Sequence, residues 1–203
     1  MLERFRTFWT RVLSPVADAL LRLGVSPDAV TLVGTAGVCA GALIFFPRGD
    51  LGVGVLVVSA FVFSDLIDGY MARASGRSSS WGAFLDSTLD RFGDAAIFGG
   101  LVLYFASIDD TPLAALALYC LVMGSVTSYA RARAESLGMQ AKVGVAERAD
   151  RLVAILVMTA FSDWFDLPVL LTATLWVLAA ASTITVVQRV LVVRRQAPRS
   201  TPA

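Results

Sequence analysis

Histidine is absent from this chain of 203 residues, and cysteine occurs only twice, at Cys39 and Cys120. Proteins hold zinc and other soft metals with imidazole and thiolate groups, so the composition excludes a site of that kind. The two cysteines stand alone in separate apolar runs, and we expect free buried thiols without a disulfide framework. The lack of histidine also leaves carboxylates as the available general bases.

Charged residues are also scarce, at 16% of the chain, whereas 57% of the residues are hydrophobic and the mean hydropathy is +0.72. This composition is typical of an integral membrane protein and excludes an ordinary soluble globule. Long apolar runs recur along the sequence and are separated by short polar connections. We therefore predict an all-α integral membrane protein with six transmembrane helices, preceded by an N-terminal interfacial amphipathic helix.

The predicted chain has three parts. Residues 1–24 mix aromatic and arginine side chains, as a helix lying in the membrane interface does. Residues 25–196 form the six-helix membrane domain, and residues 197–203 form a polar disordered tail. The fifth span must begin near Val145, because the apolar run 152–161 is too short to cross a bilayer alone. The spans are expected at about 29–46, 51–74, 81–107, 113–130, 145–161 and 168–193.

Positive charges are distributed unevenly along the chain. All lysines and arginines except Arg48 lie at the two ends, in the connections after the second and fourth spans, or within about three turns of them. By the positive-inside rule, this basic side of the membrane is the cytoplasmic side. We therefore expect a multi-pass protein of the cell membrane whose basic connections face the cytoplasm.

Four aspartates, Asp65, Asp68, Asp86 and Asp90, lie beside or inside apolar segments. An ionisable group at membrane depth costs about 2.5–3.5 kcal/mol on insertion scales, so four of them indicate a function. Their spacings of three and four residues place each pair on one face of its own helix. Carboxylates that converge from two facing helices repel one another unless cations lie between them. Oxygen ligands favour hard divalent ions, and we predict Mg²⁺ or Mn²⁺.

Small residues and an arginine accompany the aspartates. Gly69, Ala72 and Gly82 lie on or near the same helix faces, where small side chains let a ligand or another backbone approach closely. Arg73 lies one turn beyond Gly69 and has the planar fork of donors that suits phosphate. The combination indicates a phosphorylated ligand beside the metal ions.

The spacing D-x2-D-G-x2-A-R-x8-G-x3-D-x3-D is complete in this sequence. It resembles the signature of the CDP-alcohol phosphotransferases, integral membrane enzymes of phospholipid synthesis. The resemblance implies that Asp65, Asp68 and Asp86 are the principal metal ligands, and that Asp90 belongs to the same set and also acts as the base. It further implies that the CDP-lipid is bound by the motif's small residues and arginine and by the mouth of the first span: Gly69, Ala72, Arg73, Asp28 and Thr31. Alternatively, the last two are simple capping residues.

Six basic residues follow in the second half of the chain: Arg131, Arg133, Lys142, Arg148, Arg151 and Arg189. Several lie too deep for attraction to lipid headgroups, and arginine forks suit a phosphate monoester. Alternatively, all six only mark the cytoplasmic side. The chain is most similar to actinobacterial members of the family that use inositol phosphate as the acceptor. The positions that match the acceptor phosphate site are Ser128, Arg131, Arg133, Arg151 and Arg189.

The resemblance implies transfer of the phosphatidyl group from CDP-diacylglycerol to a hydroxyl of inositol phosphate, with release of CMP. Relatives are homodimers, so it also implies a homodimer, and no nucleic acid partner is expected. Glycerol 3-phosphate is another anionic polyol, which leaves phosphatidylglycerol phosphate synthesis as an alternative. A divalent-cation transporter is an alternative of a different class, although it would place aspartates nearer the bilayer midplane.

The role of Asp90 can be tested by Asp90→Asn, which keeps the size of the side chain and removes the basic carboxylate. We expect this variant to lose turnover and to keep most of its nucleotide binding, because an amide cannot take the proton of the attacking hydroxyl. CMP release and CDP-lipid binding, measured on one preparation, separate the two effects. Retained turnover would exclude Asp90 as the base.

Overall fold

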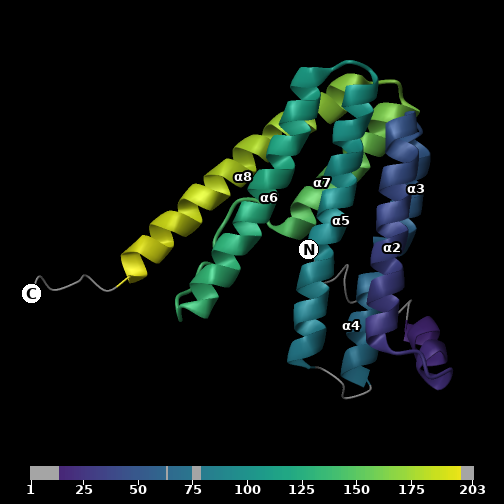
Figure 1. Ribbon diagram of the computed structural model, residues 1–203, viewed down its shortest axis with the longest axis vertical. Helices are drawn as coiled ribbons and strands as arrows, with labels where there is room; N and C mark the ends of the chain where they lie inside the picture. Colours follow the sequence, from purple (N-terminus) through teal and green to yellow (C-terminus); the bar gives the residue numbers. More distant parts are fainter. Residues whose placement is uncertain (1–13, 63, 75–78, 198–203) are drawn as a thin grey trace, which may run out of the picture. The chain divides into compact units, whose positions relative to one another are not determined.

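The computed structural model describes residues 14–62, 64–74 and 79–197, except for the side chains of Asp65 and Leu66. All regular secondary structure within these ranges is helical, as predicted (Figure 1). Residues 14–22 are helical, whereas the other residues of the predicted amphipathic helix, 1–13, and the tail residues 198–203 lie outside the described ranges. The helices that follow are α2 (Pro27–Phe45), the 3₁₀ turn η1 (Phe46–Arg48), α3 (Leu51–Val62), α4 (Ser64–Ala74), α5 (Ser80–Ser107), α6 (Thr111–Ser136), α7 (Arg148–Trp164) and α8 (Pro168–Gln196).

Four helical stretches in the described part of the chain are long and apolar enough to cross a membrane. They are Pro27–Arg48, Leu51–Ala74, Thr111–Ser136 and Pro168–Gln196. By contrast, α5 has acidic and basic residues in its first half, and α7 is only 17 residues long. An all-helical membrane architecture is therefore confirmed, while spans formed by α5 and α7 stay predictions.

The chain forms two compact units, Met1–Gly100 and Leu101–Ala203. In the first unit, α2 packs against α3 and α4 (Figure 1). Glycines permit close packing here. A Cβ at Gly41 of α2 would lie 2.9 Å from Val57 Cγ1 of α3. A Cβ at Gly100 of α5 would lie 2.8 Å from the carbonyl oxygen of Ala42 of α2. Both separations are too short for packed atoms, so the backbones are closer than larger residues would allow.

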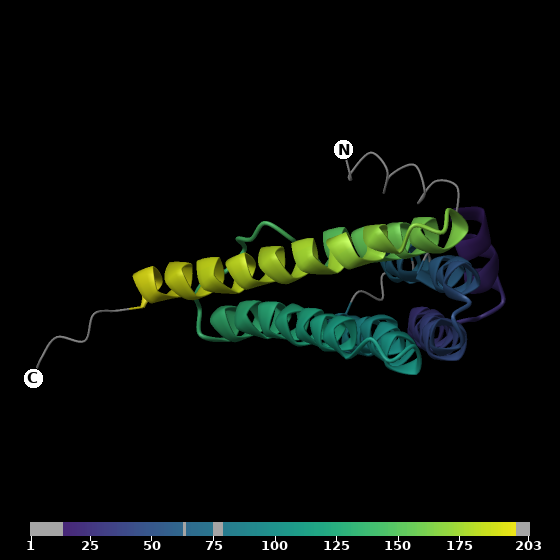
Figure 2. The ribbon, with the colours of Figure 1, turned by 90° about the horizontal axis from the view of Figure 1, so that it is seen from above.

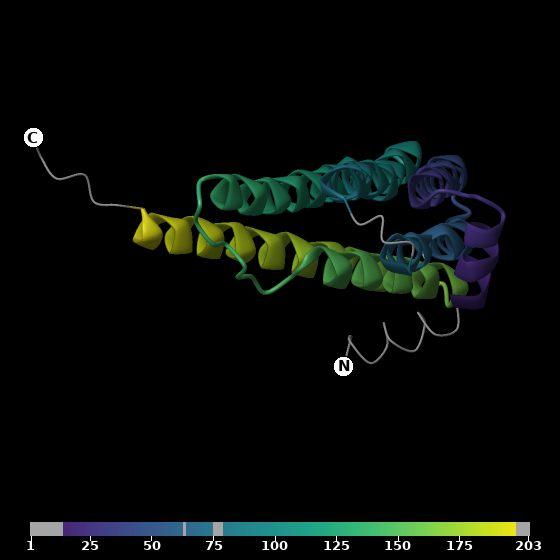
Figure 3. The ribbon, with the colours of Figure 1, turned by 90° about the horizontal axis from the view of Figure 1, so that it is seen from below.

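In the second unit, α6 and α8 run side by side and α7 packs on α8 (Figure 2, Figure 3). Cys120 of α6 is buried and its thiol donates to the carbonyl of Leu175 on α8, at 3.4 Å. Both cysteines are free, as predicted, but Cys39 is only half-buried, so the expectation of a buried thiol is wrong at that position. The interior of this unit also contains polar side chains: Thr127, Arg151, Thr159, Ser182, Thr185 and Arg189.

Local capping explains where the helices begin. Ser26 Oγ accepts from the backbone N–H of Ala29 at 3.2 Å, with proline in the first turn of α2. Asp110 caps α6 in the same way, accepting from the N–H of Leu113 at 3.0 Å. Both helices begin two residues before the predicted starts of their spans.

The helices differ from the predicted spans at several boundaries, and two of these differences have a local cause. The helix of the fourth span continues past residue 130 to Ser136, supported by an ion pair of 2.8 Å between Arg131 and Glu135 one turn apart. The predicted start of the fifth span near Val145 is wrong, because α7 begins at Arg148. Glu147 and Asp150 form a capping box there, so the acidic residues end the connection instead of extending the helix.

The packing of α5 on α2 predicts opposite effects at two neighbouring glycines. Gly100→Ala places a methyl group against a rigid backbone carbonyl, so we expect it to lower the free energy of unfolding by about 1–3 kcal/mol. A Cβ at Gly99 meets nothing within 4 Å in the described structure. Gly99→Ala should therefore be neutral or stabilise by up to about 1 kcal/mol, as alanine favours helices. Thermal unfolding in one detergent compares the variants, and equal effects would contradict the packing.

Candidate active site

The two halves of the aspartate motif lie on consecutive helices of the first unit. Asp65 and Asp68 belong to α4, and Asp86 and Asp90 lie in the first turns of α5. Asp68 is buried, Asp90 is half-buried and Asp86 is exposed. The side chain of Asp65 is not among the described side chains. Each predicted pair of aspartates therefore lies on a single helix, three or four residues apart.

Helix α2 is tied to both halves of this motif. Thr31 Oγ1 donates to Asp68 Oδ2 at 2.6 Å, a short bond of the kind that charged acceptors make. Trp81 Nε1, at the start of α5, donates to Asp28 Oδ2 at 3.1 Å. The family resemblance implied a CDP-lipid role for Asp28 and Thr31 without indicating these partners, and it did not mark Trp81. The only signal for Trp81 is that an indole N–H beside a helix start usually finds an acceptor.

Arg91 supplies positive charge from within α5. Its Nη2 atom lies 3.7 Å from Asp90 Oδ2 and 3.6 Å from Asp94 Oδ2. Asp94 is buried and Asp90 is half-buried. Arg91 therefore offsets part of the negative charge on this face of α5.

The predicted phosphate-binding arginine lies over a glycine of its own helix. A Cβ at Gly69 would lie 3.4 Å from Arg73 Nη1, and the Arg73 side chain is exposed. Ala72 and Gly82 are half-buried, and Ser79 Oγ accepts from the N–H of Gly82 at 3.0 Å at the start of α5. The guanidinium of Arg73 thus lies next to position 69, where glycine adds no side chain.

The donor set of this region consists of oxygen atoms and fits Mg²⁺ or Mn²⁺. Among the described side chains, which leave out Asp65, no three histidine, cysteine, aspartate or glutamate groups are close enough to hold a metal ion together. The metal site formed by all four aspartates therefore stays a prediction.

The five predicted acceptor residues lie on α6, α7 and α8 of the second unit. Ser128 and Arg131 are half-buried, Arg133 is exposed, and Arg151 and Arg189 are only 3% and 4% exposed. Arg151 and Arg189 are thus buried within their unit, whereas Arg133 lies at the surface, where its Nη1 is 3.4 Å from Ser136 Oγ. The depth of these arginines in the membrane stays a prediction.

Backbone carbonyls hold the two buried arginines. Arg189 donates to the carbonyls of Thr127, at 2.6 Å, and Val143, at 2.9 Å. Arg151 donates to the carbonyl of Ala146 at 3.4 Å and lies against Gly124, where a Cβ would be 3.3 Å from Nη2. These contacts fix the guanidinium groups in the interior of the unit. The two bonds of Arg189 use two of its five N–H donors.

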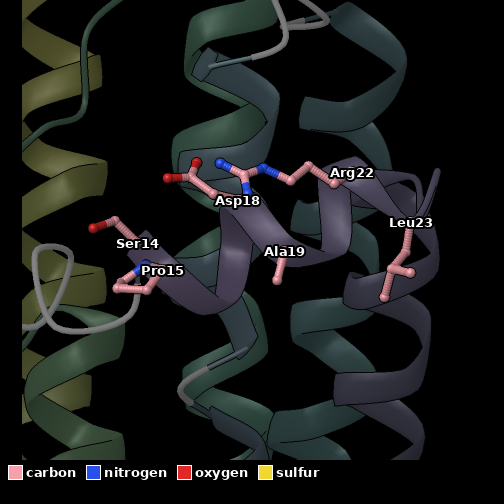
Figure 4. A pocket seen from close by; sticks show the side chains of 6 residues that line it. All are labelled: Ser14, Pro15, Asp18, Ala19, Arg22 and Leu23. Carbon is pink, nitrogen blue, oxygen red and sulfur yellow. The ribbon is translucent and has the colours of Figure 1, made fainter.

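A cavity of about 550 Å³ lies against the helix 14–22 (Figure 4). The Asp18 and Arg22 side chains extend from the same side of this helix, one turn apart (Figure 4). The lining residues are Ser14, Pro15, Asp18, Ala19, Arg22 and Leu23, and none of them belongs to the predicted site.

Comparison with known proteins gives consistent results for sequence and structure. Curated phosphatidylinositol phosphate synthases are similar to this chain over nearly its whole length. The protein from Streptomyces avermitilis is 52% identical over 211 residues, covering 100% of this chain and 86% of the relative. The protein from Cutibacterium acnes is 53% identical over 205 residues, covering 96% and 98%.

Two crystal structures of the phosphatidylinositol phosphate synthase of Mycobacterium tuberculosis have the same fold. The form with CDP-DAG bound has a TM-score of 0.85 and 43% identity, and the match covers 90% of this chain and 94% of that chain. The form in complex with manganese and citrate has a TM-score of 0.85 and 44% identity, covering 89% and 88%. The model of the CDP-alcohol phosphatidyltransferase family matches residues 24–187. This chain therefore belongs to the CDP-alcohol phosphatidyltransferase family.

Proposed function

We propose that this chain transfers the phosphatidyl group of CDP-diacylglycerol to a hydroxyl of inositol phosphate, forming phosphatidylinositol phosphate and CMP. The complete aspartate motif on α4 and α5 is the observation that carries the proposal. Relatives that are 52% and 53% identical are phosphatidylinositol phosphate synthases, which supports inositol phosphate as the acceptor. Because the chain belongs to a family of transferases, the alternative of a cation transporter is set aside.

We infer that the membrane domain has six spans, with α5 and α7 as the third and fifth. α5 has 28 residues and is about 42 Å long at 1.5 Å per residue, more than enough to cross the bilayer core. α7 has 17 residues and is about 26 Å long, so flanking residues must complete that crossing. The basic connections place the aspartate motif at the cytoplasmic side of the cell membrane. Homodimer formation is part of the same proposal and has the family resemblance as its support.

The aspartates Asp65, Asp68, Asp86 and Asp90 would hold Mg²⁺ or Mn²⁺. A divalent ion at such a site neutralises the diphosphate oxygens and stabilises the departing CMP. Thr31 donates to Asp68 and so fixes the orientation of that carboxylate. Asp90 accepts the proton of the attacking hydroxyl, since the chain contains no histidine for this task.

The remaining residues bind the two substrates. The exposed guanidinium of Arg73 faces the CDP phosphates, next to the small residues Gly69 and Ala72, while Asp28 and Thr31 lie at the start of α2. The acceptor phosphate is bound by hydroxyl and guanidinium donors of the second unit: Ser128, Arg131, Arg133, Arg151 and Arg189. Arg151 and Arg189 are held by backbone contacts, so little side-chain entropy remains to be lost when the phosphate binds.

The acceptor is tested by CMP release from CDP-diacylglycerol with purified protein and Mg²⁺. We expect turnover with inositol phosphate and little turnover with glycerol 3-phosphate or free inositol, because the arginines need a phosphate and the relatives are phosphatidylinositol phosphate synthases. Chelation of the divalent ion should abolish turnover. Preference for glycerol 3-phosphate would keep the reaction and overturn the acceptor.

The contact between Thr31 and Asp68 predicts a change in metal dependence. Thr31→Val keeps the shape of the side chain and removes the hydroxyl donor, and we expect the Mg²⁺ concentration for half-maximal activity to rise about ten- to hundredfold. Thr35→Val, one turn further along α2, is the matched control and should leave that concentration unchanged. An unchanged value in Thr31→Val would mean that Thr31 does not orient Asp68.

A further inference from the structure

The connection between α6 and α7, residues 137–147, is bound along its backbone by side chains of α8; we call this connection the strap. Gln196 binds both backbone groups of one strap residue: its Oε1 accepts from the N–H of Gln140 at 2.8 Å, and its Nε2 donates to the carbonyl of Gln140 at 2.6 Å. Further along the strap, Arg189 Nε donates to the carbonyl of Val143 at 2.9 Å.

Thr185 holds the end of the strap next to α7. Its Oγ1 accepts from the N–H groups of Val145, at 3.2 Å, and Ala146, at 3.4 Å. Gly144 has a φ of +152°, and a Cβ there would lie 2.5 Å from Thr185 Cγ2. Any other residue at position 144 would be strained and would collide with Thr185, so glycine allows the strap to pack against α8 at this point.

The three α8 residues bind the strap in reverse order. Thr185, Arg189 and Gln196 are four and seven residues apart, and they lie along one side of about 16 Å of helix. Gln196 holds position 140, Arg189 holds position 143, and Thr185 holds positions 145 and 146. The strap thus runs antiparallel to α8 with its register fixed at three points.

This register affects the proposed acceptor residues. The strap begins after α6, which carries Ser128, Arg131 and Arg133, and it ends at α7, which carries Arg151. Arg189 itself joins the strap to the Thr127 carbonyl of α6. A shift of the strap along α8 would therefore move the groups that Arg189 and Arg151 bind.

We propose that Gln196 is a positioning residue for acceptor binding. It fixes the strap at the end remote from α7, and through the strap it keeps Arg189 and Arg151 in place. Its role does not involve contact with a substrate. An amide side chain is suited to this task, because it presents one acceptor and one donor to the N–H and C=O of a single residue. The inference rests on the proposed function for the identity of the acceptor.

Steady-state kinetics test the proposal with Gln196→Ala and Gln196→Met, of which the second keeps the length of the side chain and loses both hydrogen bonds. We expect both variants to raise the KM for the acceptor about three- to tenfold, since two ordinary hydrogen bonds are lost. The KM for CDP-diacylglycerol and kcat should change by less than about twofold. Arg195→Ala changes an exposed neighbour in the same helical turn and serves as the control, with unchanged acceptor KM.

Amide hydrogen exchange provides a measurement that does not depend on turnover. Peptides that cover residues 139–147 should exchange faster in both Gln196 variants than in the wild-type protein, and the Arg195→Ala protein should match the wild type. Unchanged exchange would contradict the role of Gln196 in fixing the strap. Faster exchange with an unchanged acceptor KM would contradict the link between the strap and acceptor binding. A similar rise in both KM values together with a fall in kcat would indicate a general structural role and overturn the proposal. If the wild-type protein uses another acceptor, the proposed function fails at that point, and the KM for that acceptor is the quantity compared.

Discussion

The cost of enclosing ionised groups in a bundle of apolar helices constrains this whole structure. Asp68, Asp94, Arg151 and Arg189 are all buried, and removing each from water is unfavourable unless hydrogen bonds replace the lost hydration. The structure supplies a hydrogen bond from Thr31 to Asp68 and hydrogen bonds from the two arginines to backbone carbonyls, and it places Arg91 of the same helix 3.6 Å from Asp94 as an ion pair. Because these partners come from specific positions, the charges also restrict how the helices of each unit can pack.

The nature of the partners differs from one buried charge to another, and this difference has chemical consequences. Thr31 offers Asp68 a neutral hydroxyl donor, and backbone carbonyls offer Arg151 and Arg189 neutral acceptors. A carboxylate in the first unit is the kind of group that a divalent cation binds. Guanidinium groups in the second unit are the kind that a phosphate binds. Arg91 is placed differently, since it lies close to two carboxylates of its own helix and reduces their repulsion.

Much of the local structure follows from the sequence. Ser26 with Pro27 and Asp110 before Thr111 are ordinary capping patterns, and the helices begin where those patterns place them. The aspartate spacing also predicted which residues share a helix. The contacts between helices could not be read in this way, because Trp81 and Asp28 are 53 positions apart and Arg189 and Thr127 are 62 apart. Such pairs depend on how helices are rotated and shifted against one another. The start of α7 also could not be predicted from apolar content. The length of a membrane span suggested a start near Val145, whereas the capping box at Glu147 determines where the helix begins.

The start of α2 shows how capping and function are divided among adjacent residues. If Asp28 and Thr31 were only capping residues, their oxygens would be occupied by backbone N–H groups of the first turn. Instead, Ser26 accepts from that turn, while Asp28 accepts from Trp81 of α5 and Thr31 donates to Asp68 of α4. One turn of α2 therefore holds both halves of the aspartate motif, although those halves are separated by the connection between α4 and α5. In the proposed function the CDP-lipid binds at this turn, next to the two hydrogen bonds that join α2 to α4 and α5. Its binding and the placement of the carboxylates would then depend on the same two residues, Asp28 and Thr31.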